Sequence, residues 1–371
     1  MPFPPLNICI DMRPALSRPT GVGVYLLNIV RAIAELDSEN QYDLFSSSWK
    51  ESFPTIISAS NFHVRDHRWP VRLLTFSWNR LSFPSIEFLL GKPVDVVHSP
   101  TPLIIPSRKA RIVTTVHDLH FFLHPEDAAA EMRRDFPVLL RQHCKKSDAI
   151  IAVSEYTRQQ LIGRLEIPSS KVYAIPHGVD EYFRERVNEQ ELQRVRSKFK
   201  IQSPYFLFVG TLEPRKNLRT LLQAFRGVPD SQLVLAGPEG WGKENWQDLL
   251  NDRVVRTGYL SKEDLRALYQ GAVALVMPSL EEGFGLPLLE AMASGIPVIA
   301  SRIPVFEEIG SSAPLFFEKT DAEELRSCLQ KIQSGTELRR KHVEQGAEVV
   351  RKFSWKTAAA KTIAIYESLR A

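Results

Sequence analysis

Two carboxylates flank a glycine-containing turn in the stretch "EEGFGLPLLEAM". Glu282 stands just before the two glycines of the turn, and Glu290 lies further along the helix that Pro287 is suited to begin. The first N–H groups of such a helix have no intrahelical partner and, together with the helix dipole, favour a phosphate. Carboxylates accept hydrogen bonds from hydroxyl groups. A diphosphate between two hydroxyl-rich rings, as in a nucleotide sugar, would satisfy all of these groups.

The same stretch has a plainer explanation. Gly283 and Gly285 would merely turn the chain, and Glu290 would merely favour the positive end of the helix. Which of the two explanations holds depends on the other residues that the fold brings close to Glu282 and Glu290.

A basic pair follows the apolar run "YFLFVG" at residues 205–210. Arg215 and Lys216 stand in the turn "TLEPRKN", just before an amphipathic helical pattern. At the carboxyl end of a strand, two cations are placed to neutralise a diphosphate. The alternative is a solvated turn that happens to be charged.

Two features of the first half could serve the same ligand. His117 and Asp118 end the apolar run "RIVTTVHD" abruptly, which is typical of a functional strand end, although an aspartate also suits a turn. Gly21 and Gly23 precede a helix and permit close approach of a phosphate or sugar. The dinucleotide fingerprint needs a third glycine where Leu26 stands, so NAD binding is weakly supported.

Strand-like runs alternate with helical patterns along the whole chain. They lie at 6–11, 42–47, 62–67, 94–99, 111–118 and 149–154, and again at 205–210, 232–237, 254–259, 272–277 and 297–301. This alternation predicts an α/β protein with two doubly wound parallel sheets. We place the hinge near residues 176–183, and we expect ligands at the carboxyl ends of the strands, in a cleft shared by the two domains.

Composition narrows the possible functions. The chain has 371 residues, 44% hydrophobic and 24% charged, with a formal net charge of +4. Such a charge does not argue for nucleic-acid binding. The three cysteines are far apart, and neither a signal peptide nor a long apolar segment is evident. We therefore expect a cytoplasmic protein in which any membrane contact is peripheral.

Several catalytic signatures are missing from the sequence. It contains no Asp-x-Asp pair for a metal diphosphate, no Walker phosphate loop and no Gly-x-Ser-x-Gly elbow. The expected ligand would then be neutralised by Arg215, Lys216 and helix N–H groups, with no metal and no further cofactor.

Taken together, these motifs resemble the retaining glycosyltransferases of the GT-B fold, which include many bacterial mannosyl- and glucosyltransferases. The resemblance covers nearly the whole chain and is carried by "EGFGLPLLE", "VGTLEPRKN", "IPHGVD", "VSEYTRQQL", "GAVALVMPS" and "FSWKTAAAKTIAIYESL". It implies two Rossmann-like domains: residues 1–178, completed by a final helix at 355–371, on the acceptor side, and residues 179–354 on the donor side.

The resemblance also implies roles for single residues. Glu282 and His117 would contact the donor sugar, and Glu290 would hold the ribose hydroxyls. Arg215 and Lys216 would stabilise the departing diphosphate. The other positions assigned to the nucleotide sugar are Gly21, Gly23, Thr211, Gly237, Tyr259, Leu260, Gly283, Phe284, Gly285 and Leu286.

Two positions depart from the pattern of the family. Many members have an arginine where Thr211 follows Gly210, so Arg215 would carry more of the phosphate charge. The hinge motif, commonly Pro-Asn-Gly, contains His177 here. Since we interpret this segment mainly as a hinge, the second departure puts no chemistry in doubt.

The leading hypothesis is transfer of mannose from GDP-mannose to a growing polysaccharide or a glycolipid. The preference for mannose comes from the resemblance to polysaccharide mannosyltransferases that carry "GTLEPRKN". The alternatives are a glucosyltransferase that uses a UDP-sugar, a nucleotide-sugar epimerase of the same fold, and a binding protein without turnover. The sequence leaves the acceptor and the oligomeric state open.

Residues 65–84 mix arginines with aromatic side chains. Arg65, Arg68, Arg72 and Arg80 alternate here with Trp69, Phe76, Trp78 and Phe83. This mixture suits the interface of an anionic membrane, although an amphipathic stretch that packs into the core would have a similar composition. The hypothesis is peripheral docking of the first domain on the inner membrane surface.

Overall fold

The computed structural model describes residues 4–16, 19–53, 57–124, 130–202, 204–240 and 246–370. The chain forms two compact units. Unit 1 comprises Met1–Leu123, Glu131–Gly178 and Ser354–Ala371, and unit 2 comprises His124–Ala130 and Val179–Phe353.

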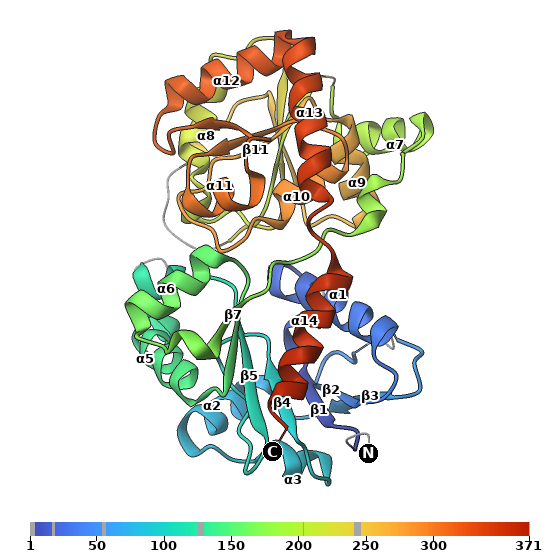
Figure 1. The fold of residues 1–371 in the computed structure, drawn as a ribbon. Helices are drawn as coiled ribbons and strands as arrows, with labels where there is room; N and C mark the ends of the chain where they lie inside the picture. The colour runs from blue at the N-terminus through green and yellow to red at the C-terminus, as the bar shows by residue number, and fades with distance from the viewer. Residues whose placement is uncertain are drawn as a thin grey trace. The chain divides into compact units, whose positions relative to one another are not determined.

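Unit 1 is built on a seven-stranded parallel sheet with helices on both sides (Figure 1). Its strands are β1 (Asn7–Asp11), β2 (Gln41–Ser47), β3 (Phe62–His67), β4 (Val96–Ser99), β5 (Arg111–Val116), β6 (Ala149–Ala152) and β7 (Val172–Ala174), in the order β3-β2-β1-β4-β5-β6-β7. Its helices are α1 (Gly21–Leu36), α2 (Val71–Leu81), α3 (Ile86–Leu90), α4 (His120–Leu123), α5 (Ala130–Lys146), α6 (Glu155–Leu165) and α14 (Trp355–Ser368). The final helix α14 packs against α1, although the two are far apart in sequence.

Unit 2 holds a six-stranded parallel sheet in the order β10-β9-β8-β11-β12-β13. Its strands are β8 (Tyr205–Val209), β9 (Gln232–Ala236), β10 (Val254–Gly258), β11 (Ala274–Met277), β12 (Val298–Ser301) and β13 (Leu315–Phe317). Its helices are α7 (Glu189–Phe199), α8 (Leu218–Phe225), α9 (Lys262–Gly271), α10 (Leu286–Ala293), α11 (Pro304–Gly310), α12 (Ala322–Ser334) and α13 (Thr336–Val350).

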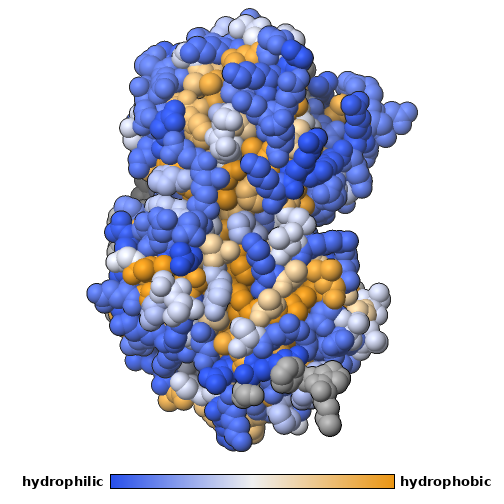
Figure 2. Space-filling model, viewed as in Figure 1, coloured by the Kyte–Doolittle hydropathy of each residue, from blue (hydrophilic) through white to orange (hydrophobic). Residues whose placement is uncertain are grey.

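Both sheets are apolar because helices cover their two faces. Strands β4, β6, β11 and β12 are buried along their whole length, and their residues are mostly apolar without a regular polar alternation. The exceptions are His98, Ser99 and Ser301 at the carboxyl ends of β4 and β12. On the face shown in Figure 2, hydrophilic side chains dominate the surface, with hydrophobic side chains exposed among them.

The predicted pair of doubly wound α/β sheets is confirmed. Two short strands, β7 and β13, were not predicted, and β7 lies in the segment that we interpreted as the approach to a hinge. Within the described residues, no helix is long and apolar enough to cross a membrane.

Candidate active site

The order of the strands in unit 2 indicates where a ligand would bind. From β8 the chain continues to β9 on one side, whereas β11 is paired on the other side of β8. The loops that follow β8 and β11 therefore leave the sheet in opposite directions. In open α/β sheets, ligands bind at the carboxyl ends of the strands at such a switch point.

These two loops are joined by backbone and side-chain hydrogen bonds. The N–H of Leu280, after β11, donates to the carbonyl of Arg215, after β8, at 2.8 Å. Asn217 adopts a left-handed conformation with φ 54°. Its amide group donates to the carbonyl of Pro278 at 3.0 Å. The turn that carries the basic pair is thus fixed against the loop that carries Glu282.

Glu282 is the centre of a buried ionic cluster. Nη1 of Arg215 donates to its Oε2 at 2.8 Å, and Nζ of Lys216 donates to its Oε1. The hydroxyl of Ser279 donates to the same Oε1 at 2.9 Å. Arg215 also pairs with Glu213 through Nε. The two cations predicted to bind a diphosphate are therefore held side by side by carboxylates.

The charged groups of this cluster shift one another's pKa values. Burial disfavours the ionised form of Glu282, but Lys216 and Arg215, with the hydroxyl of Ser279, outweigh it and lower the pKa of the carboxyl to about 2. Burial, and then the neighbouring Arg215, lower the pKa of Lys216, while Glu282 opposes them. An anion that approached these cations would relieve the repulsion between them.

Helix α10 begins directly after this cluster. Gly285 stands at its N-cap with φ +103°, a conformation that residues with a side chain rarely adopt. A Cβ there would lie 2.8 Å from Cε1 of Phe306. Leu286 begins the helix, and Pro287, which was predicted as the first helical residue, is the second. The N–H of Leu286 belongs to the first turn, where helical N–H groups have no partner within the helix.

Glu290 lies further along α10 in a different electrostatic environment. Its Oε2 accepts a hydrogen bond of 2.8 Å from the hydroxyl of Tyr269 on α9. Burial, with a contribution from Asp180, raises the pKa of Glu290 to about 7, although Tyr269 and Lys262 oppose this shift. The two carboxylates of the motif are thus shifted in opposite directions, which is typical of functional sites.

The other residues predicted in unit 2 lie in loops after β8, β9, β10 and β11. Thr211 follows β8, Gly237 follows β9, and Tyr259 and Leu260 follow β10. At Gly237, where φ is +148°, a Cβ would lie 2.0 Å from the carbonyl oxygen of Gly210. Glycine is therefore required at position 237 for the two loops to approach each other, whether or not a nucleotide lies nearby.

In unit 1, His117 directly follows the end of β5. Its Nε2 lies 3.1 Å from the carbonyl oxygen of Pro100, and its ring packs edge-on against Tyr25 with 4.9 Å between centroids. Burial lowers the pKa of His117 to about 4, against a weaker opposing effect of Asp118. The ring is therefore neutral at physiological pH. Because a carbonyl only accepts, Nε2 carries the proton, and Nδ1 is left to accept a hydrogen bond from a hydroxyl.

The two glycines of unit 1 lie in different surroundings. Gly21 begins α1, and a Cβ there would meet nothing within 4 Å. At Gly23 a Cβ would lie 2.6 Å from the carbonyl oxygen of Pro14 and 2.7 Å from Cβ of Pro19. Packing of the preceding loop thus explains the glycine at 23 without a ligand.

Several residues of the site were not predicted from the sequence. Ser279, Glu213 and Tyr269 contact the predicted carboxylates or arginine. In unit 1, His177 of the hinge motif stacks on Trp355 with 5.5 Å between ring centroids and also contacts Tyr25. His177 stands where the hinge motif commonly has asparagine, and this departure was the signal that could have indicated an aromatic cluster.

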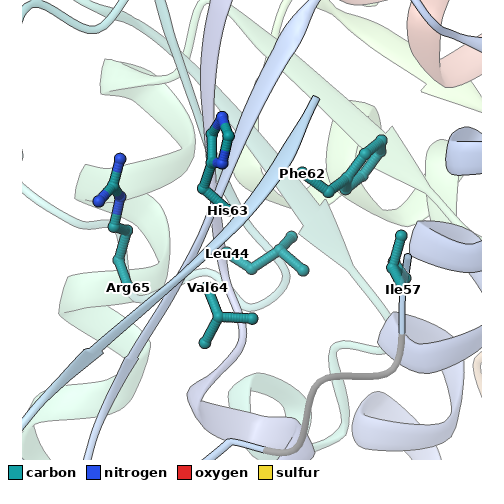
Figure 3. A pocket seen from close by; sticks show the side chains of 6 residues that line it. All are labelled: Leu44, Ile57, Phe62, His63, Val64 and Arg65. Atoms are coloured by element: carbon teal, nitrogen blue, oxygen red, sulfur yellow. The ribbon is translucent and has the colours of Figure 1, made fainter. Parts of the chain in front are cut away.

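A separate pocket lies at the edge of the sheet of unit 1. His63 and Arg65 extend to one side of β3, and Phe62 and Val64 extend to the other (Figure 3). Its lining consists of Leu44, Ile57, Phe62, His63, Val64 and Arg65, none of which was predicted to bind the donor. Among the residues that the structure describes, no three His, Cys, Asp or Glu side chains are grouped to hold a metal ion. Catalysis without metal stays a prediction.

Two family models match the chain. The model described as "Glycosyl transferases group 1" matches residues 189–349, and the model described as "Glycosyltransferase Family 4" matches residues 19–182. The first contains the whole ionic cluster and Glu290, and the second contains His117.

Two curated relatives cover most of the chain. The O-antigen chain mannosyltransferase B of Escherichia coli is 30% identical, over 94% of this chain and 96% of the relative. The O-antigen chain mannosyltransferase RfbU of Salmonella typhimurium is also 30% identical, over 85% of this chain and 87% of the relative.

Solved structures share the fold at lower identity. Sucrose-phosphate synthase from Thermosynechococcus elongatus has a TM-score of 0.79 at 21% identity and covers 98% of this chain and 99% of its own. WaaG, a glycosyltransferase involved in lipopolysaccharide biosynthesis, has a TM-score of 0.73 at 15% identity and covers 97% of this chain and 99% of its own.

Proposed function

Because the chain belongs to the glycosyl transferases group 1 family, we propose that it transfers mannose from GDP-mannose to a saccharide acceptor. Membership makes the protein a glycosyltransferase of the GT-B fold and confirms the family predicted from its motifs. The names of the two O-antigen mannosyltransferases support the choice of mannose and of a polysaccharide acceptor.

One observation carries the proposal for the chemistry. The buried cluster of Arg215, Lys216 and Glu282 stands at the carboxyl ends of β8 and β11, directly before α10. Two adjacent cations and the start of a helix together suit a diphosphate. We assign the diphosphate of the donor to this position and the ribose hydroxyls to Glu290.

In the proposed reaction, the bond between C1 of mannose and the diphosphate oxygen breaks. A hydroxyl oxygen of the acceptor bonds to C1, its proton passes to the departing phosphate, and GDP is released. Negative charge gathers on the phosphate as the bond breaks, and Arg215 and Lys216 would stabilise it more strongly in the transition state than in the bound donor. These cations take the role that a metal ion has in other transferases, so we propose no metal.

Two further side chains are assigned to the sugar, one from each unit. His117 offers an acceptor at Nδ1 for a sugar hydroxyl, which its bond to Pro100 leaves available. Glu282 would keep Arg215 and Lys216 in place and contact a sugar hydroxyl. We propose that the acceptor attacks from the same face as the leaving group, with retention of configuration.

A donor panel tests this proposal. The protein is incubated with GDP-mannose, UDP-glucose and other nucleotide sugars, and release of the nucleotide and thermal stabilisation are both measured. GDP-mannose at a hundred times its dissociation constant should stabilise the fold by about 2.7 kcal/mol. A preference for UDP-glucose would identify a glucosyltransferase. Conversion of the donor's sugar into its epimer when no acceptor is present would identify an epimerase. Binding of a nucleotide sugar without turnover would identify a non-catalytic protein.

We further propose that the acceptor is lipid-linked and that the protein works in the cytoplasm at the inner membrane surface. A growing surface polysaccharide on a lipid carrier would be presented there, and a peripheral contact would keep the enzyme near it. Comparing a water-soluble saccharide with the same saccharide on a lipid carrier tests this point. Equal rates with both would contradict it.

A further inference from the structure

The apolar residues of α2 are divided between two faces. Leu74 and Trp78 are buried and belong to the core of unit 1, where they pack with Phe45 and Val97. Leu73 and Phe76, on the same helix, are 65% and 63% exposed. A helix that is apolar on both its inner and its outer face is normally covered on both sides. Among the residues that the structure describes, Leu74 and Trp78 on the inner face are covered, whereas Leu73 and Phe76 on the outer face are not.

The exposed apolar residues continue beyond α2. Leu81, Phe83 and Phe88 are each at least half exposed, and the rings of Phe83 and Phe88 lie 5.6 Å apart. The indole N–H of Trp78 donates to the carbonyl of Pro84 at 2.9 Å, which holds the end of α2 to the segment before α3. Helices α2 and α3 lie in the lower part of unit 1 in Figure 1.

Basic side chains border this apolar area. Arg80 is exposed at the end of α2, and the helix carries no acidic residue. Glu87 of α3 accepts backbone hydrogen bonds from Arg108 and Lys109, so these two exposed residues lie next to α3, the helix that carries Phe88. Within the described part of the chain, no ion pair uses the side chains of Arg80, Arg108 or Lys109.

We propose that this α2–α3 surface, formed by Leu73, Phe76, Arg80, Leu81, Phe83, Phe88, Arg108 and Lys109, docks on a membrane that contains anionic lipid. Exposed leucine and phenylalanine side chains enter the boundary between headgroups and acyl chains, and the basic residues meet the negative headgroups. The excess of positive charge favours an anionic lipid surface over a second copy of this chain, which would bring the same positive charges together. The inference concerns binding alone and does not rest on the identity of the donor.

The sequence had suggested a wider surface over residues 65–84, and the structure revises it. Trp78 is buried and takes no part in the surface, and Arg65 is paired with Asp43 at 2.8 Å. The side chain of Arg72 lies outside the described residues. Phe88 is added because its ring lies 5.6 Å from that of Phe83, and Arg108 and Lys109 are added because their backbone N–H groups donate to Glu87 of α3.

Sedimentation with vesicles tests the proposal. The full chain is mixed, without any donor, with vesicles of phosphatidylcholine alone or of phosphatidylcholine with phosphatidylglycerol. Binding should require phosphatidylglycerol and weaken as salt is added. Replacing Arg80 and Lys109 with Gln should weaken it about five-fold per residue, and Leu73→Ser with Phe76→Ser about ten-fold per residue.

Two exposed residues elsewhere on unit 1 provide a matched control. Leu36 is 46% exposed at the end of α1, and Tyr173 is 41% exposed on β7. Leu36→Ser and Tyr173→Ser also replace one exposed aliphatic and one exposed aromatic side chain, and they should leave vesicle binding unchanged. Circular dichroism and thermal unfolding of each variant separate loss of binding from loss of fold.

Three outcomes would overturn the proposal. The first is absence of binding to the anionic vesicles. The second is equal binding by the Leu73→Ser/Phe76→Ser variant and the control variants, which would show that another surface is used. The third is self-association of the native protein that increases with concentration, is abolished in the Leu73→Ser/Phe76→Ser variant and occurs without vesicle binding. That result would identify the surface as a protein interface. Because no donor is present, failure here leaves the proposed glycosyl transfer untouched.

Discussion

Replacing Glu290 with Gln should make the ligand-free protein more stable at alkaline pH while it weakens donor binding. The pKa of this carboxyl is raised from 4.5 to about 7, chiefly by burial. The folded protein thus holds the proton more tightly than the unfolded chain. The stability that this contributes is fully present below pH 4.5 and is lost as the pH rises through about 7. Glutamine carries no charge and should not show this loss.

The size of the effect follows from the shift. Each pKa unit corresponds to about 1.4 kcal/mol, so Glu290→Gln should raise the free energy of unfolding at pH 8 by up to about 3 kcal/mol relative to the native sequence. The gain will be smaller to the extent that water reaches the partly exposed carboxylate. At pH 5 the two proteins should differ little. The amide oxygen of Gln still accepts the hydrogen bond from Tyr269, so packing is preserved.

Glu282→Gln provides the matched comparison, because its pKa is lowered to about 2. The stability from that ionised carboxylate is present above pH 4.5 and is lost as the pH falls towards 2. Its replacement leaves the buried Lys216 without its charged partner, and at pH 8 it should therefore destabilise the fold. Urea unfolding at pH 5 and pH 8, with titration of GDP-mannose, measures both variants. If Glu290→Gln also destabilised the ligand-free protein at pH 8, burial would not be the dominant effect on Glu290.

Three further predictions concern the donor site. Lys216→Ala should lower kcat about 10²–10³-fold at saturating donor, because charge on the departing phosphate loses a partner, and unchanged turnover would refute this assignment. Activity should persist in EDTA, whereas a loss that magnesium or manganese restores would show that the cations do not replace a metal. Tyr269→Phe should raise the Kd of the donor about five- to ten-fold by releasing Glu290, while Tyr205→Phe, which removes another buried tyrosine hydroxyl of unit 2, should leave the Kd unchanged.

The sequence predicted most strands because their apolar runs are long enough to stand out from the flanking turns. β7 and β13 were missed because each has only three residues and gives almost no periodic signal. Alternating strands and helices predict parallel βαβ units but not the order of the strands, which the structure supplies. That order places the loops after β8 and β11 at a switch point, and the role of these loops in chemistry stays a prediction.

The contacts within those loops could not be predicted in the same way. Glu282 meets Arg215 and Lys216 from 67 and 66 positions away, and nothing in either motif states that the three side chains converge. Glycines were a second source of difficulty. Gly23 and Gly237 fit a ligand-binding interpretation in the sequence, yet their absent Cβ atoms would collide with Pro14 and Gly210. Close approach of a ligand and close approach of the chain itself require the same residue type.

The helix α2 shows a related limit of sequence patterns. Leu73 and Leu74 are identical neighbours, but successive residues of a helix point about 100° apart, so one can enter the core while the other faces solvent. Among the described side chains of this helix, Leu74 and Trp78 are the two that are buried in the core. The apolar residues on the outer face of α2 add nothing to the stability of unit 1 by itself, and they expose hydrophobic area to water. The fold does not account for the exposed Leu73 and Phe76, and the exposed Arg80 on the same helix is consistent with the negatively charged lipid surface that we propose as their partner.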